Sequence, residues 1–231
     1  ENISYIWIKI PRTGTVSYRK LFELYNTTKQ SDIHHHNTYL QAKNFFGKYP
    51  GFSVVRNPLH RFISSLKYIK QEKHKCLTGK CNFNREHCQA HNVFLDFLDS
   101  TERCIEFLQT HFIKNCLLKK NPVRSNADLL RPGINNIFQV EDPFFITSFF
   151  SLQTEFAYYP NVKIFRYENL SEFNDWLHTT FGYDTTLLKP QNSSQDVSLS
   201  VNVEDPEFIK TVEMLFYDDY KAFNYPFQYL T

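Results

Sequence analysis

The sequence lacks several features that would place it quickly in a class of protein. Its 231 residues contain no run of about 18 apolar residues, so no transmembrane helix is predicted within them. The formal net charge is only +2, which argues against a general nucleic-acid binder and requires any anion site to be local. Glycine is scarce, with 6 residues, and is expected to mark turns. The 23 Phe and 14 Tyr residues, by contrast, predict an aromatic core.

Cysteine is absent from both flanks of the chain. The 5 cysteines are Cys76, Cys81, Cys88, Cys104 and Cys116. Disulfides formed in a secretory lumen, or free buried thiols, would explain this cluster, and the odd count leaves one thiol over. Histidines lie among the cysteines, but the spacing contains no CxxC pair, so zinc is the less favoured interpretation.

Strand-like segments alternate with helix-like segments along the chain. Three short runs rich in β-branched and aromatic residues have the profile of buried strands, at 3–10, 52–55 and 162–167. Each is followed by apolar residues at helical spacing, at 15–26, 59–70 and 171–180. The alternation predicts a single α/β domain over residues 1–231, with a parallel sheet flanked by helices.

The remaining segments fit the alternation less well. Residues 73–91 are polar, contain cysteines and lack periodicity, which predicts an irregular insertion. Further helices are predicted at 93–98, 105–112, 143–153 and 206–223. The stretch 191–200 is rich in Ser and Asn, which is typical of a mobile loop over a ligand.

The first strand-to-helix junction has the composition of an anion site. It reads Pro11-Arg12-Thr13-Gly14-Thr15-Val16-Ser17. Free backbone N–H groups at a helix start, the helix dipole, several hydroxyls and one cation would favour an anion there. The segment is not the loop GxxxxGK[ST] of triphosphate-binding proteins, because no Lys follows Gly14 in register. A tight turn without a ligand is the alternative.

The second junction adds an arginine at a strand end and a hydroxyl in the following helix. It reads Arg56-Asn57-Pro58-Leu59-His60-Arg61-Phe62-Ile63-Ser64. Arg56 can grip a phosphate through two parallel N–H donors, and Ser64 can donate a third hydrogen bond. The alternatives are a surface ion pair for Arg56 and a helix cap or solvent contact for Ser64.

These two motifs resemble those of the PAPS-dependent sulfotransferases, which use 3′-phosphoadenosine-5′-phosphosulfate (PAPS) as donor. The family motifs read like P-K-T-G-x-T-S and R-[DN]-P-x-x-R-x-x-S, in the same order as here. The resemblance implies the sulfotransferase architecture, a P-loop-like parallel sheet flanked by helices. It also implies that the first loop holds the 5′-phosphosulfate, and that Arg56 and Ser64 hold the 3′-phosphate of PAPS and of the product PAP.

Weaker similarities extend the resemblance over most of the chain. Residues 162–170 resemble a family strand that ends in Tyr-Glu-x-Leu, and residues 216–225 resemble its C-terminal Asp-Tyr-x-x-Phe-Gly-Tyr helix. Ser193 and Ser194 fall where relatives carry a loop over the 3′-phosphate, although a solvated loop explains them equally well. One departure is that Arg12 stands where the family usually has Lys. We expect Arg12 to hold the leaving group, although arginine and lysine are not interchangeable.

Sulfuryl transfer needs a base for the acceptor hydroxyl, and histidine is the natural choice because its pKa lies near neutrality. The segment 34–40 resembles the His-x-His-x-x-Tyr-Leu segment of heparan sulfate 2-O-sulfotransferase, which makes His36 the base and His34 a polar assistant. The resemblance therefore favours a carbohydrate acceptor. A surface run of histidines is the alternative, and Glu23 or Glu168 would then be candidate bases.

The predicted reaction is an in-line displacement in which Arg12 and the loop amides stabilise the departing PAP, and no metal is expected. A P-loop nucleotide kinase, or a non-catalytic module that binds a nucleotide or a glycan, is the alternative. Basic residues of 67–80 would line a path for an acidic glycan, or simply form a solvated surface. Because the sequence starts at Glu1, a membrane anchor can precede it, and the Golgi lumen or secretory pathway is expected for a eukaryotic source.

Overall fold

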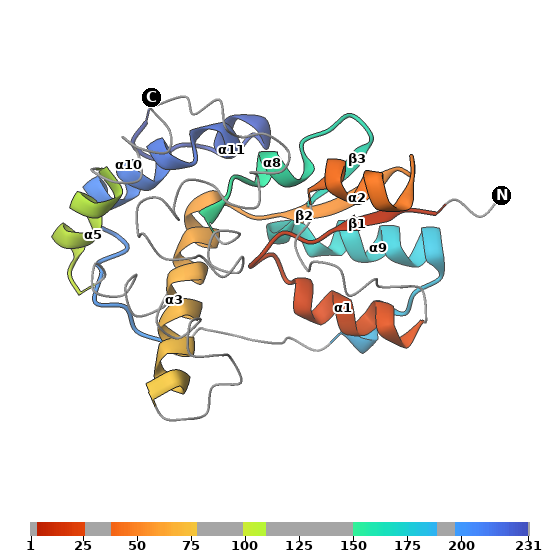
Figure 1. Ribbon diagram of the computed structural model, residues 1–231, viewed down its shortest axis with the longest axis horizontal. Helices are drawn as coiled ribbons and strands as arrows, with labels where there is room; N and C mark the ends of the chain where they lie inside the picture. Colours follow the sequence, from red (N-terminus) through yellow and green to blue (C-terminus); the bar gives the residue numbers. More distant parts are fainter. Residues whose placement is uncertain (1–3, 26–37, 78–98, 110–149, 189–196, 231) are drawn as a thin grey trace. The chain divides into compact units, whose positions relative to one another are not determined.

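The computed structural model describes residues 4–25, 38–77, 99–109, 150–188 and 197–230 (Figure 1). The chain divides into two compact units. The first is made of Glu1–Asn57 and Gln153–Ser193, and the second of Pro58–Leu152 and Ser194–Thr231. The expectation of a single domain over 1–231 stays a prediction.

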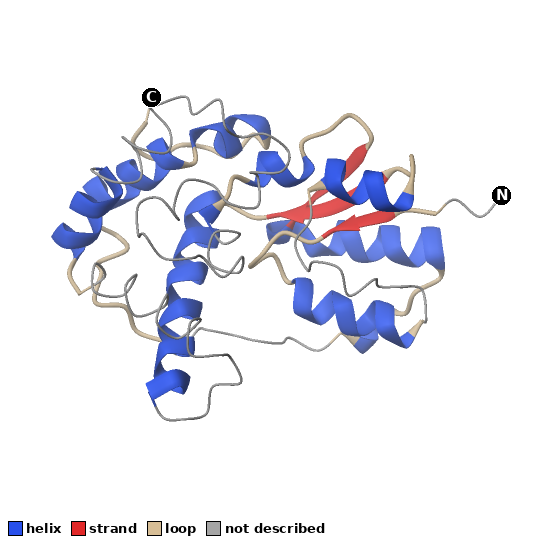
Figure 2. Cartoon of the chain, in the orientation of Figure 1, coloured by secondary structure: helices blue, strands red, loops and turns tan. Residues whose placement is uncertain are grey.

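The first unit contains a parallel three-stranded sheet, shown in red in Figure 2. The strands are β1 (Ile6–Ile8), β2 (Gly51–Val55) and β3 (Val162–Arg166), in the order β1-β2-β3. Ile8 of β1 pairs with Ser53, and Val55 of β2 pairs with Arg166. The predicted α/β class with a parallel sheet is confirmed, and the expected strand at 3–10 is shorter than predicted.

Helices cover both faces of this sheet (Figure 1). On one face lie α1 (Thr15–Leu24) and α9 (Leu170–Phe181), and on the other lies α2 (Tyr39–Phe46). Shorter elements complete the unit: α8 (Gln153–Ala157), η2 (Tyr167–Asn169) and η3 (Thr185–Leu187). Alternation along β2 sends Phe52 and Val54 into the core shared with α1 and α9.

The core of the first unit is built from aromatic rings, as the composition predicted. Phe52 is 4% exposed, and its ring meets those of Phe22, Phe173 and Trp176 at centroid distances of 6.2, 5.9 and 5.0 Å. Such tilted and edge-on pairs add about 0.5–1.5 kcal/mol each beyond the area that they bury. The sheet that carries the candidate site is therefore held on one face by a dense aromatic layer.

The second unit is helical over its described residues. Its elements are α3 (Pro58–Leu77), α5 (Thr101–Phe107), α10 (Pro206–Leu215) and α11 (Tyr217–Ala222). Phe62 on α3 is 1% exposed and contacts the rings of Phe150, Phe208 and Phe216. This apolar contact joins α3 to α10.

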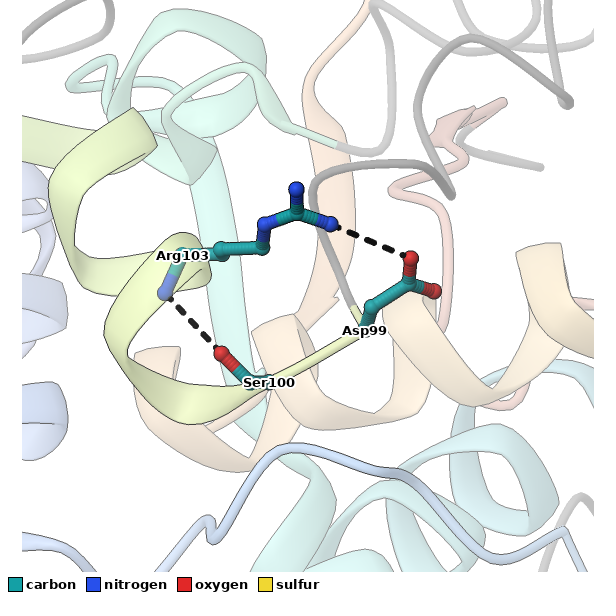
Figure 3. Close-up of polar contacts among 3 residues, drawn as sticks. All are labelled: Asp99, Ser100 and Arg103. Atoms are coloured by element: carbon teal, nitrogen blue, oxygen red, sulfur yellow. Dashed lines mark hydrogen bonds and ion pairs between the residues drawn. The ribbon is translucent and has the colours of Figure 1, made fainter.

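Local hydrogen bonds fix the start of α5 (Figure 3). Ser100 is the N-cap, and its hydroxyl oxygen accepts the backbone N–H of Arg103 at 3.3 Å. The side chain of Arg103 pairs with Asp99 at 3.5 Å, an exposed pair that contributes little to stability. Cys104, one turn further on, is a free buried thiol, and burial raises its pKa to about 12. The other four cysteine side chains lie outside what the structure describes.

Several predicted helix boundaries were wrong. α3 continues to Leu77, so residues 73–77 are helical rather than part of an irregular insertion. The periodicity argument missed this part of the helix because residues 73–77 include two Lys and one His, although Lys is a good helix former. The helix predicted at 143–153 is interrupted at 151–152, and α8 begins only at Gln153. The last predicted helix is two helices, which meet at Phe216.

Other predictions fall on parts of the chain that the structure does not describe. They are the rest of the insertion at 78–91, the helix at 93–98 and most of the loop at 191–200. None of the described helices is long and apolar enough to cross a membrane.

Candidate anion-binding site

Three strand ends meet at one edge of the sheet. β1, β2 and β3 are parallel neighbours, so their carboxyl ends lie together. The segment Pro11–Ser17 follows β1, Arg56 follows β2, and Tyr167 and Glu168 follow β3. The carboxyl edge is where ligands bind in open α/β sheets.

The turn after β1 has a constrained backbone. Arg12 has φ 67° and Gly14 has φ 80°, both in the left-handed region. The Thr13 hydroxyl is buried and donates to the Ile10 carbonyl at 2.8 Å, which ties the turn to the strand. Backbone with alternating left-handed residues turns successive N–H groups to a common side, where they can bind an anion.

Helix α1 starts from this turn without a capping side chain and without an acidic residue in its first turn. Its N-cap is Gly14. The Gly14 carbonyl accepts the N–H of Ser17 at 3.1 Å. Unsatisfied N–H groups and the helix dipole both favour a negative ligand at such a start.

Gly14 is favoured by its backbone conformation and by the limited space around its Cα. A Cβ on residue 14 would lie 3.2 Å from Cε2 of Tyr167, and the φ of 80° already disfavours any side chain. The Tyr18 ring lies on the same side, at 3.8 Å. Tyr18 donates a hydrogen bond to Asn174 at 2.7 Å, and burial raises the pKa of its hydroxyl, with Tyr167 adding to the effect. Tyr18 therefore stays neutral at physiological pH.

Arg56 reaches the turn from the next strand. Its Nη1 donates to the Arg12 carbonyl at 3.4 Å, and its guanidinium carbon lies 4.6 Å from the centre of the Tyr167 ring. The arginine thus stacks on the aromatic residue that also abuts Gly14. Arg56, at the start of the second junction, therefore lies beside the turn of the first junction within the first unit.

Two side chains hold the backbone around Arg56. The Arg56 N–H donates to Oε1 of Gln153 at 2.9 Å, and Nε2 of Gln153 donates to the Arg56 carbonyl at 2.8 Å. The Asn57 N–H donates to Oε1 of Glu168 at 2.7 Å. Sequence reasoning missed Gln153 altogether, because it lies 97 residues from Arg56 and no local pattern marks it.

The chemistry of this edge is that of an anion site. Arg12 and Arg56 supply two cations, and the α1 start supplies amides and hydroxyls. No group of three or more His, Cys, Asp or Glu that could hold a metal occurs among the residues that the structure describes. An anion with several oxygens, such as a phosphate or a phosphosulfate, matches these donors.

The other predicted site residues are distributed as follows. Ser64 lies on α3 in the second unit and is 8% exposed. Glu23 pairs with Arg19 at 3.4 Å on the last turn of α1, about 13 Å of helix beyond Gly14. Glu23 is therefore at the wrong end of α1 to act at the turn. His34, His36, Ser193 and Ser194 lie outside the described residues.

Arg61, the second arginine of the Arg56–Ser64 motif, has a different environment. Its side chain is 1% exposed, and Nη1 donates to the Ser151 carbonyl at 2.9 Å within the second unit. Its own carbonyl accepts the Ser65 hydroxyl at 3.0 Å. Arg61 therefore holds segments of the second unit together.

A family model described as the sulfotransferase family matches residues 6–226 of the chain. No curated protein and no solved structure matches it. The matched range contains all three strand ends that form the anion-binding edge.

Proposed function

The chain belongs to the sulfotransferase family, and we propose that it moves the sulfuryl group of PAPS to an acceptor hydroxyl. The observation that supports this most directly is the hydrogen bond from Arg56 Nη1 to the Arg12 carbonyl. It brings Arg56, the arginine that we assign to the 3′-phosphate, beside a turn that suits a second anion. A donor with phosphate groups at the 3′ and 5′ positions of one ribose needs two such sites.

In this proposal each of the two junctions binds a different phosphate group of the donor. The turn Arg12, Thr13, Gly14, Thr15, Val16 and Ser17 binds the 5′-phosphosulfate. Arg56 and Ser64 bind the 3′-phosphate, with Ser193 and Ser194 closing over it. A nucleotide kinase is not favoured, because the turn lacks the lysine of the triphosphate loop and the family match is to sulfotransferases.

The proposed reaction is a single in-line displacement. The acceptor oxygen forms a bond to sulfur while the bond from sulfur to the 5′-phosphate oxygen breaks. His36, assisted by His34, takes the proton of the acceptor hydroxyl, and the electron pair of the broken bond leaves on PAP. Arg12 and the amides at the start of α1 stabilise the charge that grows there.

A carbohydrate hydroxyl is the proposed acceptor. The resemblance of residues 34–40 to a heparan sulfate sulfotransferase segment supports it. Lys67 and Lys70, both half-buried on α3, would suit an acidic glycan. Glu168 is a poorer candidate base than His36, because one of its carboxylate oxygens already accepts the Asn57 N–H.

The donor is tested by thermal unfolding with PAP and, separately, with ATP and magnesium. PAP at 100 times its Kd should add about 2.7 kcal/mol of stability, and ATP should add much less. Arg56→Met should lose most of the PAP effect. Selective stabilisation by ATP with magnesium would favour the kinase, and PAP binding without turnover of labelled PAPS would favour a non-catalytic module.

The base is tested by His36→Ala, with His35→Ala as the matched control from the same run of histidines. We expect His36→Ala to abolish sulfuryl transfer while the Kd for PAP stays unchanged, and His35→Ala to retain turnover. Wild-type turnover in His36→Ala would remove His36 from the mechanism. A panel of glycan, peptide and phenol acceptors with labelled PAPS would identify the acceptor.

A further inference from the structure

The side chain of Gln153 forms two hydrogen bonds with the backbone of a single residue, Arg56. Oε1 accepts the Arg56 N–H at 2.9 Å, and Nε2 donates to the Arg56 carbonyl at 2.8 Å. Two residues on paired strands exchange the same pair of bonds. Val55 is the last residue of β2, so the carboxamide of Gln153 prolongs the ordered backbone by one residue beyond the strand.

Gln153 is well placed to hold that residue still. Its side chain is 0% exposed, and it is the first residue of α8, which packs against β2 in the first unit (Figure 1). A buried carboxamide whose position is set by a packed helix loses little further entropy when it bonds the backbone. Because the Gln153 side chain is wholly buried, a ligand that enters from solvent does not contact it.

We propose that Gln153 is a positioning residue that orients the side chain of Arg56 toward the 3′-phosphate of the donor. This proposal rests on the proposed function. The guanidinium lies at the end of a long side chain, so a small rotation of the Arg56 backbone moves it far from the Arg12 carbonyl and the Tyr167 ring. A misplacement of roughly 1 Å in a site can cost about 100-fold in rate.

The role predicts an effect on one phosphate and not on the other. PAP and adenosine 5′-monophosphate differ only in the 3′-phosphate, so the ratio of their Kd values reports the contact that Arg56 makes. A general loss of protein stability would lower the affinity for both nucleotides together. A misplaced Arg56 would lower the affinity for PAP and leave the affinity for adenosine 5′-monophosphate nearly unchanged.

The test is isothermal titration calorimetry of both nucleotides with Gln153→Met, which keeps the length of the side chain and removes both hydrogen bonds. We expect PAP affinity to fall about tenfold and the affinity for adenosine 5′-monophosphate to stay within about twofold. Gln153→Glu keeps an acceptor for the Arg56 N–H and loses the donor, so it should give an intermediate ratio. It also serves if the Met variant does not fold.

A double-mutant cycle with Arg56→Met separates positioning from general damage. With Arg56 truncated, Gln153→Met should cause no further change in the ratio of the two Kd values. Thr211→Val is the matched control, because Thr211 is 1% exposed and bonds Gln109 in the second unit. It should lower the Tm without changing the ratio.

The outcomes distinguish this inference from the function on which it rests. A wild-type protein that binds both nucleotides equally would refute the proposed 3′-phosphate site and the positioning role with it. A wild-type preference for PAP that persists in Gln153→Met and in Gln153→Glu would overturn the positioning role alone. Additive losses in the double mutant would overturn it as well.

Discussion

Replacing Arg12 by glycine should make the protein more stable and less active at the same time. Arg12 has φ 67°, a conformation that costs a residue with a Cβ about 1–2 kcal/mol. Glycine adopts it without strain but loses about 0.5–1 kcal/mol more chain entropy on folding. The difference predicts a gain of about 0.5–1 kcal/mol, or roughly 1–4 °C in Tm for a chain of 231 residues.

The Arg12→Ala variant isolates the backbone effect. Both variants lose the guanidinium and whatever it contacts, but only alanine keeps the strain, so the comparison of glycine with alanine measures the strain less the entropy cost of glycine. The Arg12 carbonyl that accepts Arg56 Nη1 remains in both variants. Under the proposed mechanism, turnover of PAPS should fall by roughly 100-fold to 1,000-fold in each variant, because each removes the cation that we propose for the leaving group.

Asn224→Gly is the control for glycine at a left-handed position away from the turn. Asn224 has φ 53° and stands where the family motif has glycine. Asparagine adopts this left-handed conformation more readily than most residues with a Cβ. Asn224→Gly should raise the Tm by a smaller amount and leave turnover unchanged. Thermal unfolding without ligand and a radiolabelled sulfate assay supply both readouts. An Arg12→Gly protein less stable than Arg12→Ala would refute the strain argument.

Two further predictions, each with a control substitution, test the packing of the two units, and all four variants are followed by thermal unfolding. Gly14→Ala should destabilise by about 1–2 kcal/mol and also weaken PAP binding, because its Cβ meets Tyr167. Gly182→Ala has φ 73° with open space around the Cβ, so equal stability loss with normal PAP binding is expected there. Glu213→Ala should cost about 3 kcal/mol, because the buried carboxylate accepts three backbone N–H groups near the C-terminus. The exposed Lys210→Ala on the same helix should change stability by less than about 0.5 kcal/mol, and a similar cost for both would contradict the reasoning.

The sequence was most informative where an element is defined by its own residues. The strand at 52–55 and the helix starting near residue 59 have strong periodicity, and both are present. Helix α2 was missed because its eight residues carry a weak pattern and depend on distant contacts. The Tyr39 hydroxyl donates to the Tyr49 carbonyl at 2.9 Å, and a Cβ on Gly51 would lie 3.0 Å from the Tyr39 ring.

In the candidate site, too, the sequence predicted the residues that belong to local patterns and missed those that depend on tertiary packing. The turn after β1 and Arg56 after β2 were found because strand-to-helix junctions with small or basic residues are local patterns. That they converge follows from adjacent parallel strands, which no local pattern reveals. Gln153 could not be found, since a glutamine far along the chain acquires its role only when α8 packs on β2.

The two arginines of one short motif show why a motif match cannot assign roles residue by residue. Arg56 is half-buried at a strand end and faces the turn, whereas Arg61 is 1% exposed and donates to the Ser151 carbonyl. A wholly buried guanidinium bonded to a carbonyl serves the fold, because removing it would leave that carbonyl unsatisfied. Ser151 lies two residues before Gln153, which holds Arg56 in the other unit. One short segment thus supports both arginines, Arg56 through the side chain of Gln153 and Arg61 through the backbone carbonyl of Ser151, so a side-chain substitution removes the first contact and leaves the second in place.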